Sequence, residues 1–518
     1  MEKEKEMIDG KLLVEKLLRY AENFLHLNKR DEIYFRNLLL REFKLDAPLK
    51  EQVDLSYVDT LDVPDTLVND LEEYALENGI IEDGEQNFYS TYIMGLLSPL
   101  PSKVNQTFNE IKNTQGIEKA CEYFYNLSVK NNYVQKTAIG RNLKWEYVDG
   151  DRTLEITINL SKPEKNNKEI AKLLTAPKSE KYPSCFLCKE NEGFQGHATH
   201  PARENIRTIS LTMGGEPWFV QYSPYAYYNE HMIAISENHV KMHIKADTVK
   251  KVLDFVDFFP NYMIGSNASL PLIGGSILDH EHFQGGEHLM PMHKAPIKEY
   301  YTSKEFPQVT IGKVDWYNSV IRLISKDRQA IEDLTTKIIE TWETFDCEEC
   351  GIFGVTDGVA HNSLSPVCRK DGDNYVMDMI LRNNLTSEEY PEGVFHAHPE
   401  YHNIKREGIG LIEAMGLFIL PGRLKNQLAQ IAEILCGKVK YDIDELNKED
   451  NPLYIHRNMI AELVEGGLVD SYEKAEQKVT DKVNDVCRNI LFNTAVFKND
   501  QTGINGFDKF LKAVNITK

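Results

Sequence analysis

The sequence has no apolar run long enough to cross a membrane. Its most apolar stretch, residues 252–278, is interrupted by acidic residues, a proline and amides, at Asp254, Asp257, Pro260, Asn261 and Asn267. A membrane helix needs about 20 consecutive apolar residues. The first ten residues, MEKEKEMIDG, also lack the basic and then apolar pattern of a secretory signal. We therefore expect a cytoplasmic protein without a membrane partner, whose eight cysteines are thiols or metal ligands rather than disulfides.

The sequence also lacks an excess of positive charge. Lys and Arg number 59 against 80 Asp and Glu, so the formal net charge is −21. A nucleic-acid binder needs a basic face that displaces counterions from phosphates, so this class of protein is not expected. A phosphorylated small molecule is still compatible with the charge, because a local cationic pocket can lie inside an acidic protein.

No short repeat and no low-complexity tract divides the 518 residues, and the composition, with 42% hydrophobic and 27% charged residues, is that of a globular protein. Apolar residues recur at helical spacing through residues 1–130, with a break at Pro99–Pro101. This region predicts an N-terminal helical extension without catalytic residue types, most readily a structural or oligomerisation layer.

From about residue 131 the pattern changes to alternating apolar and polar residues, which is typical of half-buried strands. We expect a first mixed domain over residues 131–325, with a helix at 246–258 and strands at 145–147, 154–160, 208–212, 218–222, 232–235 and 272–278. A second mixed domain follows over residues 326–518, with strands at 375–381 and 394–398 and helices at 410–420, 424–435, 455–465 and 472–491. Each mixed stretch has a predicted His-x-His strand, so a diverged duplication is one interpretation.

The densest group of chemically useful side chains is Asp279-His-Glu-His-Phe-Gln284. Side chains alternate faces on a strand, so His280, His282 and Gln284 would point the same way. A neutral imidazole can attack phosphorus and form a covalent intermediate. Flanking glycines (Gly274, Gly275, Gly285 and Gly286) would let a bulky ligand approach the backbone. The alternative is a pair of ordinary core or surface histidines.

Two further groups can bind metal. Cys185 and Cys188 form a Cys-x-x-Cys pair at zinc-ligand spacing, and His239 and His280 would complete a Cys2His2 set. A second pair, Cys347 and Cys350, has no partner that the sequence assigns. Another histidine group, His396 and His398 with His361 upstream, is interpreted either as a second metal site or as part of a substrate pocket.

These stretches resemble the galactose-1-phosphate uridylyltransferases of the histidine-triad superfamily, and most closely the second, Firmicutes-type class. The resemblance spans nearly the whole chain. It is carried by residues 33–39, 94–101, 204–208, 215–218, 223–225, 229–231, 279–284, 361–363, 382–384, 396–398 and 416–421. It implies an α+β fold with a histidine-triad-like catalytic core of antiparallel sheet and helical regions at both ends.

The resemblance also implies roles for single residues. It makes His282 the nucleophile and Gln284 the ligand of the transferred phosphoryl group, and it assigns structural zinc to Cys185, Cys188, His239 and His280. Glu281 and Phe283 stand where the first class has proline and glycine, and the glutamate ligand of the family's second metal is not located. The second metal is therefore left open.

The implied reaction is a ping-pong exchange of UMP between UDP-glucose and galactose 1-phosphate, in a protein that is usually a homodimer in this family. Donors are needed for the charge on the phosphoryl oxygens. The residues expected to bind substrate are Gly275, Ser276, Asn267, Arg141, Lys405 and Arg406. Two alternatives are a histidine-triad hydrolase or phosphorylase of dinucleotides and a zinc-stabilised nucleotide-sugar binding protein.

Overall fold

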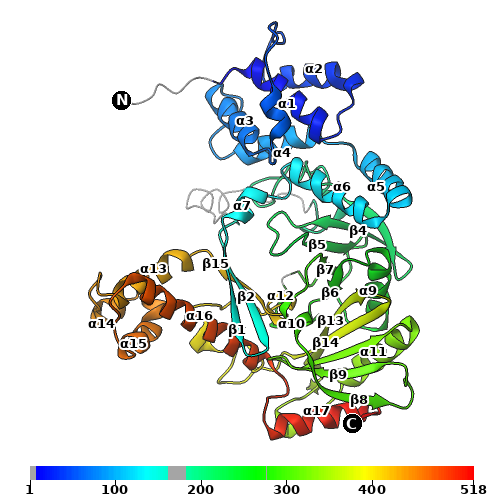
Figure 1. The fold of residues 1–518 in the computed structure, drawn as a ribbon, viewed down its shortest axis with the longest axis vertical. Coiled ribbons are helices and arrows are strands. Elements are labelled where there is room, and N and C mark those ends of the chain that lie inside the picture. Colours follow the sequence, from blue (N-terminus) through cyan, green and yellow to red (C-terminus); the bar gives the residue numbers. More distant parts are fainter. Residues whose placement is uncertain (1–7, 162–181, 276) are drawn as a thin grey trace. The chain divides into compact units, whose positions relative to one another are not determined.

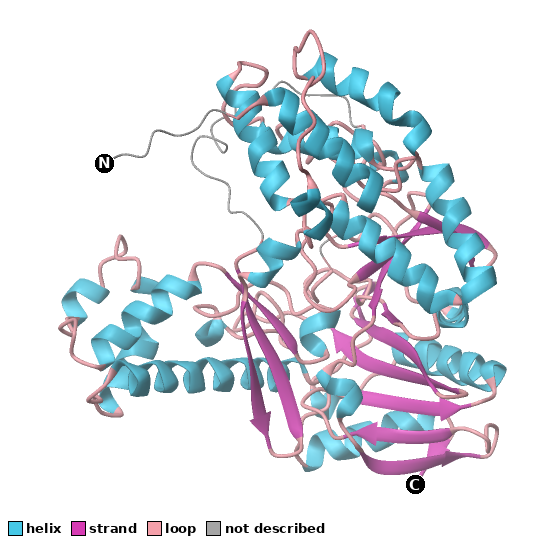
Figure 2. Cartoon of the chain, turned by 45° about the horizontal axis from the view of Figure 1, so that its top comes forward, coloured by secondary structure: helices cyan, strands magenta, loops and turns pink. Residues whose placement is uncertain are grey.

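The computed structural model describes residues 8–161, 182–275 and 277–518. It has an α+β fold in which the sheets are mostly antiparallel and the two terminal regions are helical, as the sequence predicts (Figure 2). The chain forms two compact units. The first unit comprises residues 1–141 and 161–240, and the second comprises residues 142–160 and 241–518. Among the described helices, none has the length and apolar character to cross a membrane.

The predicted helical extension is confirmed in the first unit. It consists of α1 (Gly10–Phe24), α2 (Glu32–Glu42), α3 (Asp65–Glu77), α4 (Gln86–Leu97), α5 (Pro101–Gln115), α6 (Ile117–Lys130) and the short α7 (Lys136–Gly140). Asp9 caps α1 by accepting the Lys11 backbone N–H at 2.8 Å. The break at Pro99–Pro101 separates α4 from α5, which begins at Pro101 because the first helical position needs no N–H donor.

Three antiparallel strands complete the first unit: β3 (Ile209–Met213), β4 (Glu216–Tyr222) and β5 (Met232–Ser236). Buried Arg207, just before β3, joins them to the helices. Its guanidinium donates to the carbonyls of Gly95 at 3.0 Å and Pro99 at 2.6 Å. Asn105 reinforces this contact by donating to the Thr208 carbonyl at 2.8 Å. The helical extension therefore packs as one body with β3 to β5.

We expect Glu204, in the same contact, to make the stability of the first unit depend on pH. Burial raises the pKa of Glu204 to about 7 from 4.5. Below pH 4.5 both folded and unfolded states carry the proton, and as the pH rises through 7 the folded state loses a stabilising contribution. We expect urea unfolding at pH 8 to show about 1–2 kcal/mol less stability from this group than at pH 5. Glu204→Gln should remove that difference, and an equal pH dependence in the variant would contradict the assignment.

The second unit contains a sheet in the order β16-β8-β9-β10-β14-β13-β6-β7, with antiparallel neighbours. The strands are β6 (Met263–Gly265), β7 (His282–Gly286), β8 (Ile297–Ser303), β9 (Thr310–Val314), β10 (Val320–Ser325), β13 (Asn362–Asp371), β14 (Asn374–Asn383) and β16 (Ile516–Thr517). Helices α9 (Ala246–Phe258) and α11 (Arg328–Glu343) pack side by side on one face of it (Figure 1).

A smaller sheet in this unit contains β1 (Leu143–Asp149), β2 (Arg152–Asn159) and β15 (Leu417–Pro421), with β15 parallel to β2. The remaining elements are α10 (Pro291–Lys294), β11 (Val355–Thr356), β12 (Val359–Ala360), α12 (Leu411–Ala414), α13 (Leu424–Leu435), α14 (Ile443–Leu446), α15 (Arg457–Glu465), α16 (Tyr472–Thr494) and α17 (Gln501–Ala513).

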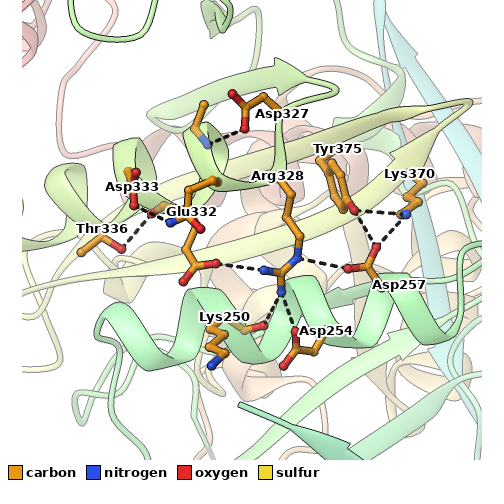
Figure 3. Close-up of polar contacts among 12 residues, drawn as sticks. Lys250, Asp254, Asp257, Asp327, Arg328, Glu332, Asp333, Thr336, Lys370 and Tyr375 are labelled. Carbon is orange, nitrogen blue, oxygen red and sulfur yellow. Dashed lines mark hydrogen bonds and ion pairs between the residues drawn. The ribbon is translucent and has the colours of Figure 1, made fainter. Parts of the chain in front are cut away.

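Arg328 holds α11 against α9 on the helix-covered face. Its guanidinium contacts the carboxylates of Asp254 and Asp257 on α9 and of Glu332 on α11 (Figure 3). Asp257 also accepts from Tyr375 of β14 at 2.7 Å, so the cluster ties both helices to the sheet.

The strand register shows which side chains share the other face. Gln284 pairs with Gly265, Gly265 with Val367, and Val367 with Asp378. Paired residues in antiparallel strands project to the same side. His282 and Gln284 therefore lie on the face opposite α9, and so does every second residue of β14 counted from Asp378. Leu411 covers part of this face, because a Cβ at Gly265 would lie 2.9 Å from its side chain.

Three sequence predictions of secondary structure were wrong. Residues 272–278 form turns rather than a strand wherever they are described, and Leu272 has a positive φ of 67°. Residues 394–398 form a loop between Gly393, with φ 127°, and the helical turn at Pro399. No described strand pairs with that loop, so one reason to infer a duplication is lost. The predicted helix at 410–420 ends at Ala414, and Gly416, with φ 96°, turns the chain into β15.

Candidate active site

His282 is the first residue of β7, and its side chain is 6% exposed. Its Nδ1 lies 2.8 Å from the His280 carbonyl oxygen. Because a carbonyl can only accept, Nδ1 carries the ring proton and Nε2 keeps its lone pair. Burial lowers the pKa of the His282 imidazole, which keeps it neutral. The ring is therefore held in the tautomer that a nucleophile needs. Half-buried Gln284 lies on the same face of β7.

Glu281 points the other way, toward α9. Its fully buried carboxylate accepts from the Lys251 ammonium at 3.0 and 3.1 Å, and Lys251 is itself only 2% exposed. Lys251 also donates to Asp247 at 3.0 Å, and Asp247 is 2.8 Å from His243. Burial lowers the pKa of the Lys251 ammonium, but the hydrogen bonds to Asp247 and Glu281 outweigh it and the net shift is upward.

His243, Asp247 and Glu281 offer ligand atoms at metal-binding spacing. The Lys251 ammonium already lies among these carboxylates, so the group has a resident cation. Lys251 had no signal in the sequence beyond the helical pattern of residues 246–258. Its role depends on a partner thirty residues later in the chain.

The glycine-rich loop before β7 is packed against protein. A Cβ at Gly274 would lie 2.4 Å from the backbone of Gly410, and Gly274 has a φ of 93°. At Gly275 it would lie 2.4 Å from the Leu278 side chain. The space beside these two glycines is therefore filled by the chain itself. Asn267 is also engaged, since its Oδ1 accepts the Leu411 N–H at 2.9 Å. Ser276 lies outside the described residues.

Three of the four predicted zinc ligands come together in the first unit. Cys185, Cys188 and His239 offer ligand atoms within 4.8 Å of one another, and the Cys188 Sγ is 3.1 Å from His239 Nδ1. Asn191 shapes the cysteine turn by donating to the carbonyls of both cysteines. Burial raises the pKa of the Cys188 thiol to about 12. Two sulfurs and an imidazole are the donor set that zinc prefers. The fourth predicted ligand, His280, is buried in the second unit.

The structure does not gather the second histidine group around a metal position. In the described ranges, His361, His396 and His398 belong to no cluster of three metal-ligand residues. His361 Nδ1 contacts Asn384, and His398 stacks on Tyr390 with ring centroids 4.0 Å apart. His396 is buried, and burial together with the charge of Arg382 lowers its pKa to about 4.

The predicted substrate-binding cations have protein partners or lie at the surface. The Lys405 ammonium is 3.0 Å from Glu413 and from the Ile419 carbonyl, and Arg406 is 2.9 Å from Glu392. Arg141 is exposed at the end of α7. Their role toward substrate stays a prediction.

The sequence alone assigns no role to Arg382. It lies on β14, its side chain is fully buried, and burial lowers the pKa of its guanidinium to about 10. The only sequence signal was its place in the Arg-Asn-Asn stretch of residues 382–384.

Comparison with known proteins agrees over nearly the full length. The family model described as galactose-1-phosphate uridyl transferase, N-terminal domain, matches residues 27–241, and the model of the C-terminal domain matches residues 251–449. A galactose-1-phosphate uridylyltransferase of Caldanaerobacter subterraneus is 44% identical over 98% of this chain and 99% of its own length. Relatives of the same name from Fusobacterium nucleatum and Clostridium acetobutylicum are each 39% identical, over 97% and 96% of this chain and 98% of their own lengths.

One solved structure, yeast Ap4A phosphorylase Apa2, is similar over 70% of this chain and 92% of its own, with 10% identity and a TM-score of 0.31. The two family models and the full-length relatives are decisive: this chain belongs to the galactose-1-phosphate uridylyltransferase family.

Proposed function

We propose that this chain transfers the uridylyl group of UDP-glucose to galactose 1-phosphate through a covalent intermediate on His282. The observation that carries the proposal is the bond between His282 Nδ1 and the His280 carbonyl, which leaves Nε2 as a nucleophile. The family relationship supplies the reaction and its substrates.

The reaction has two balanced steps. In the first, Nε2 attacks the α-phosphorus, the bond from this phosphorus to the bridging oxygen breaks, and glucose 1-phosphate leaves. In the second, a phosphate oxygen of galactose 1-phosphate attacks the same phosphorus, the bond to Nε2 breaks, and UDP-galactose forms. Both leaving groups are stable without an added proton, so no strong general acid is required. Gln284, on the same face as His282, is suited to donate to the phosphoryl oxygens.

The proposal includes a structural zinc ion on Cys185, Cys188 and His239, with His280 as the fourth ligand that the family resemblance implies. When bound, zinc would fix the cysteine turn and the segment after β5. We expect Cys188→Ser to lose most of its bound zinc, measured by elemental analysis of the purified protein, because a hydroxyl is a poor replacement for a thiolate. Cys436→Ser, in a half-buried thiol outside the cluster, is the control. Full zinc content in Cys188→Ser would contradict this ligand set.

The deciding experiment is an intact mass after incubation with UDP-glucose. We expect an adduct of one uridylyl group, which galactose 1-phosphate discharges as UDP-galactose. An adduct that decays in water at the same rate with or without galactose 1-phosphate would indicate a hydrolase instead. No adduct on folded, metal-replete protein would contradict covalent transfer. A cytoplasmic location and a homodimer remain part of the proposal, the second testable by sedimentation.

A further inference from the structure

Arg382 is a buried cation whose own chain leaves it largely unsatisfied. Its side chain is fully buried in β14, and Nη2 donates to the Ile409 carbonyl at 2.9 Å. Among the described residues, the buried Nε and Nη1 atoms have no hydrogen-bond partner. An uncompensated buried charge is strongly unfavourable, so a position of this kind calls for a ligand that supplies the missing acceptors.

Two other buried cations, Arg322 and Lys405, have carboxylate partners within the chain. Arg322, in the same sheet, pairs with both oxygens of Asp378 at 2.6 and 3.0 Å and donates to the carbonyls of Met292 and Ala295. Glu413 is the carboxylate whose charge acts on Arg382, and it is already paired with the Lys405 ammonium. The chain therefore satisfies these cations with its own groups and leaves Arg382 without an equivalent partner.

His396 presents a further unused donor beside Arg382. Its Nε2 accepts the N–H of Ile409 at 3.3 Å, while Arg382 donates to the carbonyl of the same residue. The two side chains thus flank one peptide residue. With Nε2 accepting, the His396 proton is on Nδ1, and this buried atom also has no hydrogen-bond partner among the described residues. All the unused atoms are donors, which favours an anion and disfavours a metal cation.

The strand register places Arg382 on the face of the sheet that carries His282 and Gln284, opposite α9. Asp378 lies in the same row as Gln284, and Arg382 is four residues beyond it, in the direction in which His282 lies two residues from Gln284. Three strand spacings across and two residues along give roughly 16 Å between the Cα atoms of Arg382 and His282. Two long side chains and a phosphate between them can bridge this distance.

We propose that Arg382, with the Nδ1–H of His396, binds the phosphate of the sugar 1-phosphate that leaves or attacks at His282. This inference rests on the proposed function for the identity of the ligand. A guanidinium matches a phosphate because its planar set of N–H donors binds two oxygens at once. In this site Nε and Nη1 are the free pair, since Nη2 is held by Ile409.

The test uses Arg382→Met on the full chain, with Arg328→Met as the matched control. Arg328 lies on the opposite face and is held by carboxylates of α9 and α11 (Figure 3). Binding of inorganic phosphate, galactose 1-phosphate and uridine is measured by calorimetry. We expect Arg382→Met to bind both phosphate ligands about 100-fold more weakly and uridine unchanged, because charge-assisted hydrogen bonds are lost. Arg328→Met should bind all three as the native protein does.

Arg382→Met should also unfold at the native temperature or above it, since it removes an unpaired buried charge. If this variant does not fold, Arg382→Lys tests the inference instead, because lysine keeps the positive charge but loses the planar set of N–H donors. It should bind both phosphate ligands about 10-fold more weakly. Native phosphate affinity in either folded variant overturns the inference.

Failure of the proposed function has a different outcome. If no uridylyl adduct forms but phosphate binding still depends on Arg382, the anion site stands and the reaction is wrong. If the adduct forms and the KM for galactose 1-phosphate is unchanged in the variants, the reaction stands and the anion site is wrong.

Discussion

Replacing His282 with alanine is expected to lower the rate of uridylyl transfer by about 10⁴-fold or more. The proposed covalent route depends on Nε2 of this ring, which keeps its lone pair because Nδ1 is held by the His280 carbonyl at 2.8 Å. Among the described residues, the ring forms one hydrogen bond, to a carbonyl two residues away, so its loss should leave the fold intact. The measurement is kcat for UDP-galactose formation, together with the circular dichroism spectrum of the variant.

Gln284→Ala is the graded comparison for this prediction. Gln284 is proposed to stabilise charge rather than to form the covalent bond, so its loss should cost about 10²–10³-fold in kcat and should leave the adduct detectable. A His282→Ala protein that keeps more than a hundredth of the native rate would contradict the covalent mechanism. Equal losses in the two variants would show that the roles are not divided in this way.

Local patterns predicted much of the secondary structure. The helices at 246–258 and 424–435 have the predicted bounds, and β3 to β5 lie within a residue or two of the predicted strands. These elements have clear hydrophobic periodicity, so neighbours in sequence determine them. The His-x-His-x-Gln spacing likewise placed His282 and Gln284 on one face, because strand geometry alone fixes that relation.

The failures depend on long-range partners. The alternating pattern of residues 394–398 predicts a strand, but none of the described strands pairs with them, and a strand needs a partner for its backbone groups. The residues of β15 were predicted as part of a helix, because the partner strand that makes them a strand, β2, lies more than 250 residues earlier. The roles of Lys251 and Arg382 could not be predicted for the same reason, since the groups around each of them come from distant parts of the sequence.

Lys251→Met is expected to lower the free energy of unfolding by about 3–5 kcal/mol, because it leaves the Glu281 carboxylate buried without its cation. Glu281 and Lys251 expose 1% and 3% of their side chains, so water cannot take the place of the ammonium. The measurement is urea unfolding of the native and variant proteins, with Lys250→Met, an exposed neighbour on α9, as the control.

The pair also fixes the segment between His280 and His282, so its loss should affect the reaction as well as stability. Lys251→Met should lower kcat for uridylylation more than it raises the KM for UDP-glucose, because Glu281 contacts α9 and lies away from the face that carries His282 and Gln284. Lys251→Met with Glu281→Leu removes both charges and should recover most of the lost stability, since an apolar pair of similar volume replaces a buried ion pair at little cost.

If the double variant regains stability but not kcat, Glu281 and Lys251 position His282. If it regains both, the ion pair is only one of several ways to hold the strand. A loss below 1 kcal/mol in Lys251→Met would show that Glu281 is satisfied without Lys251.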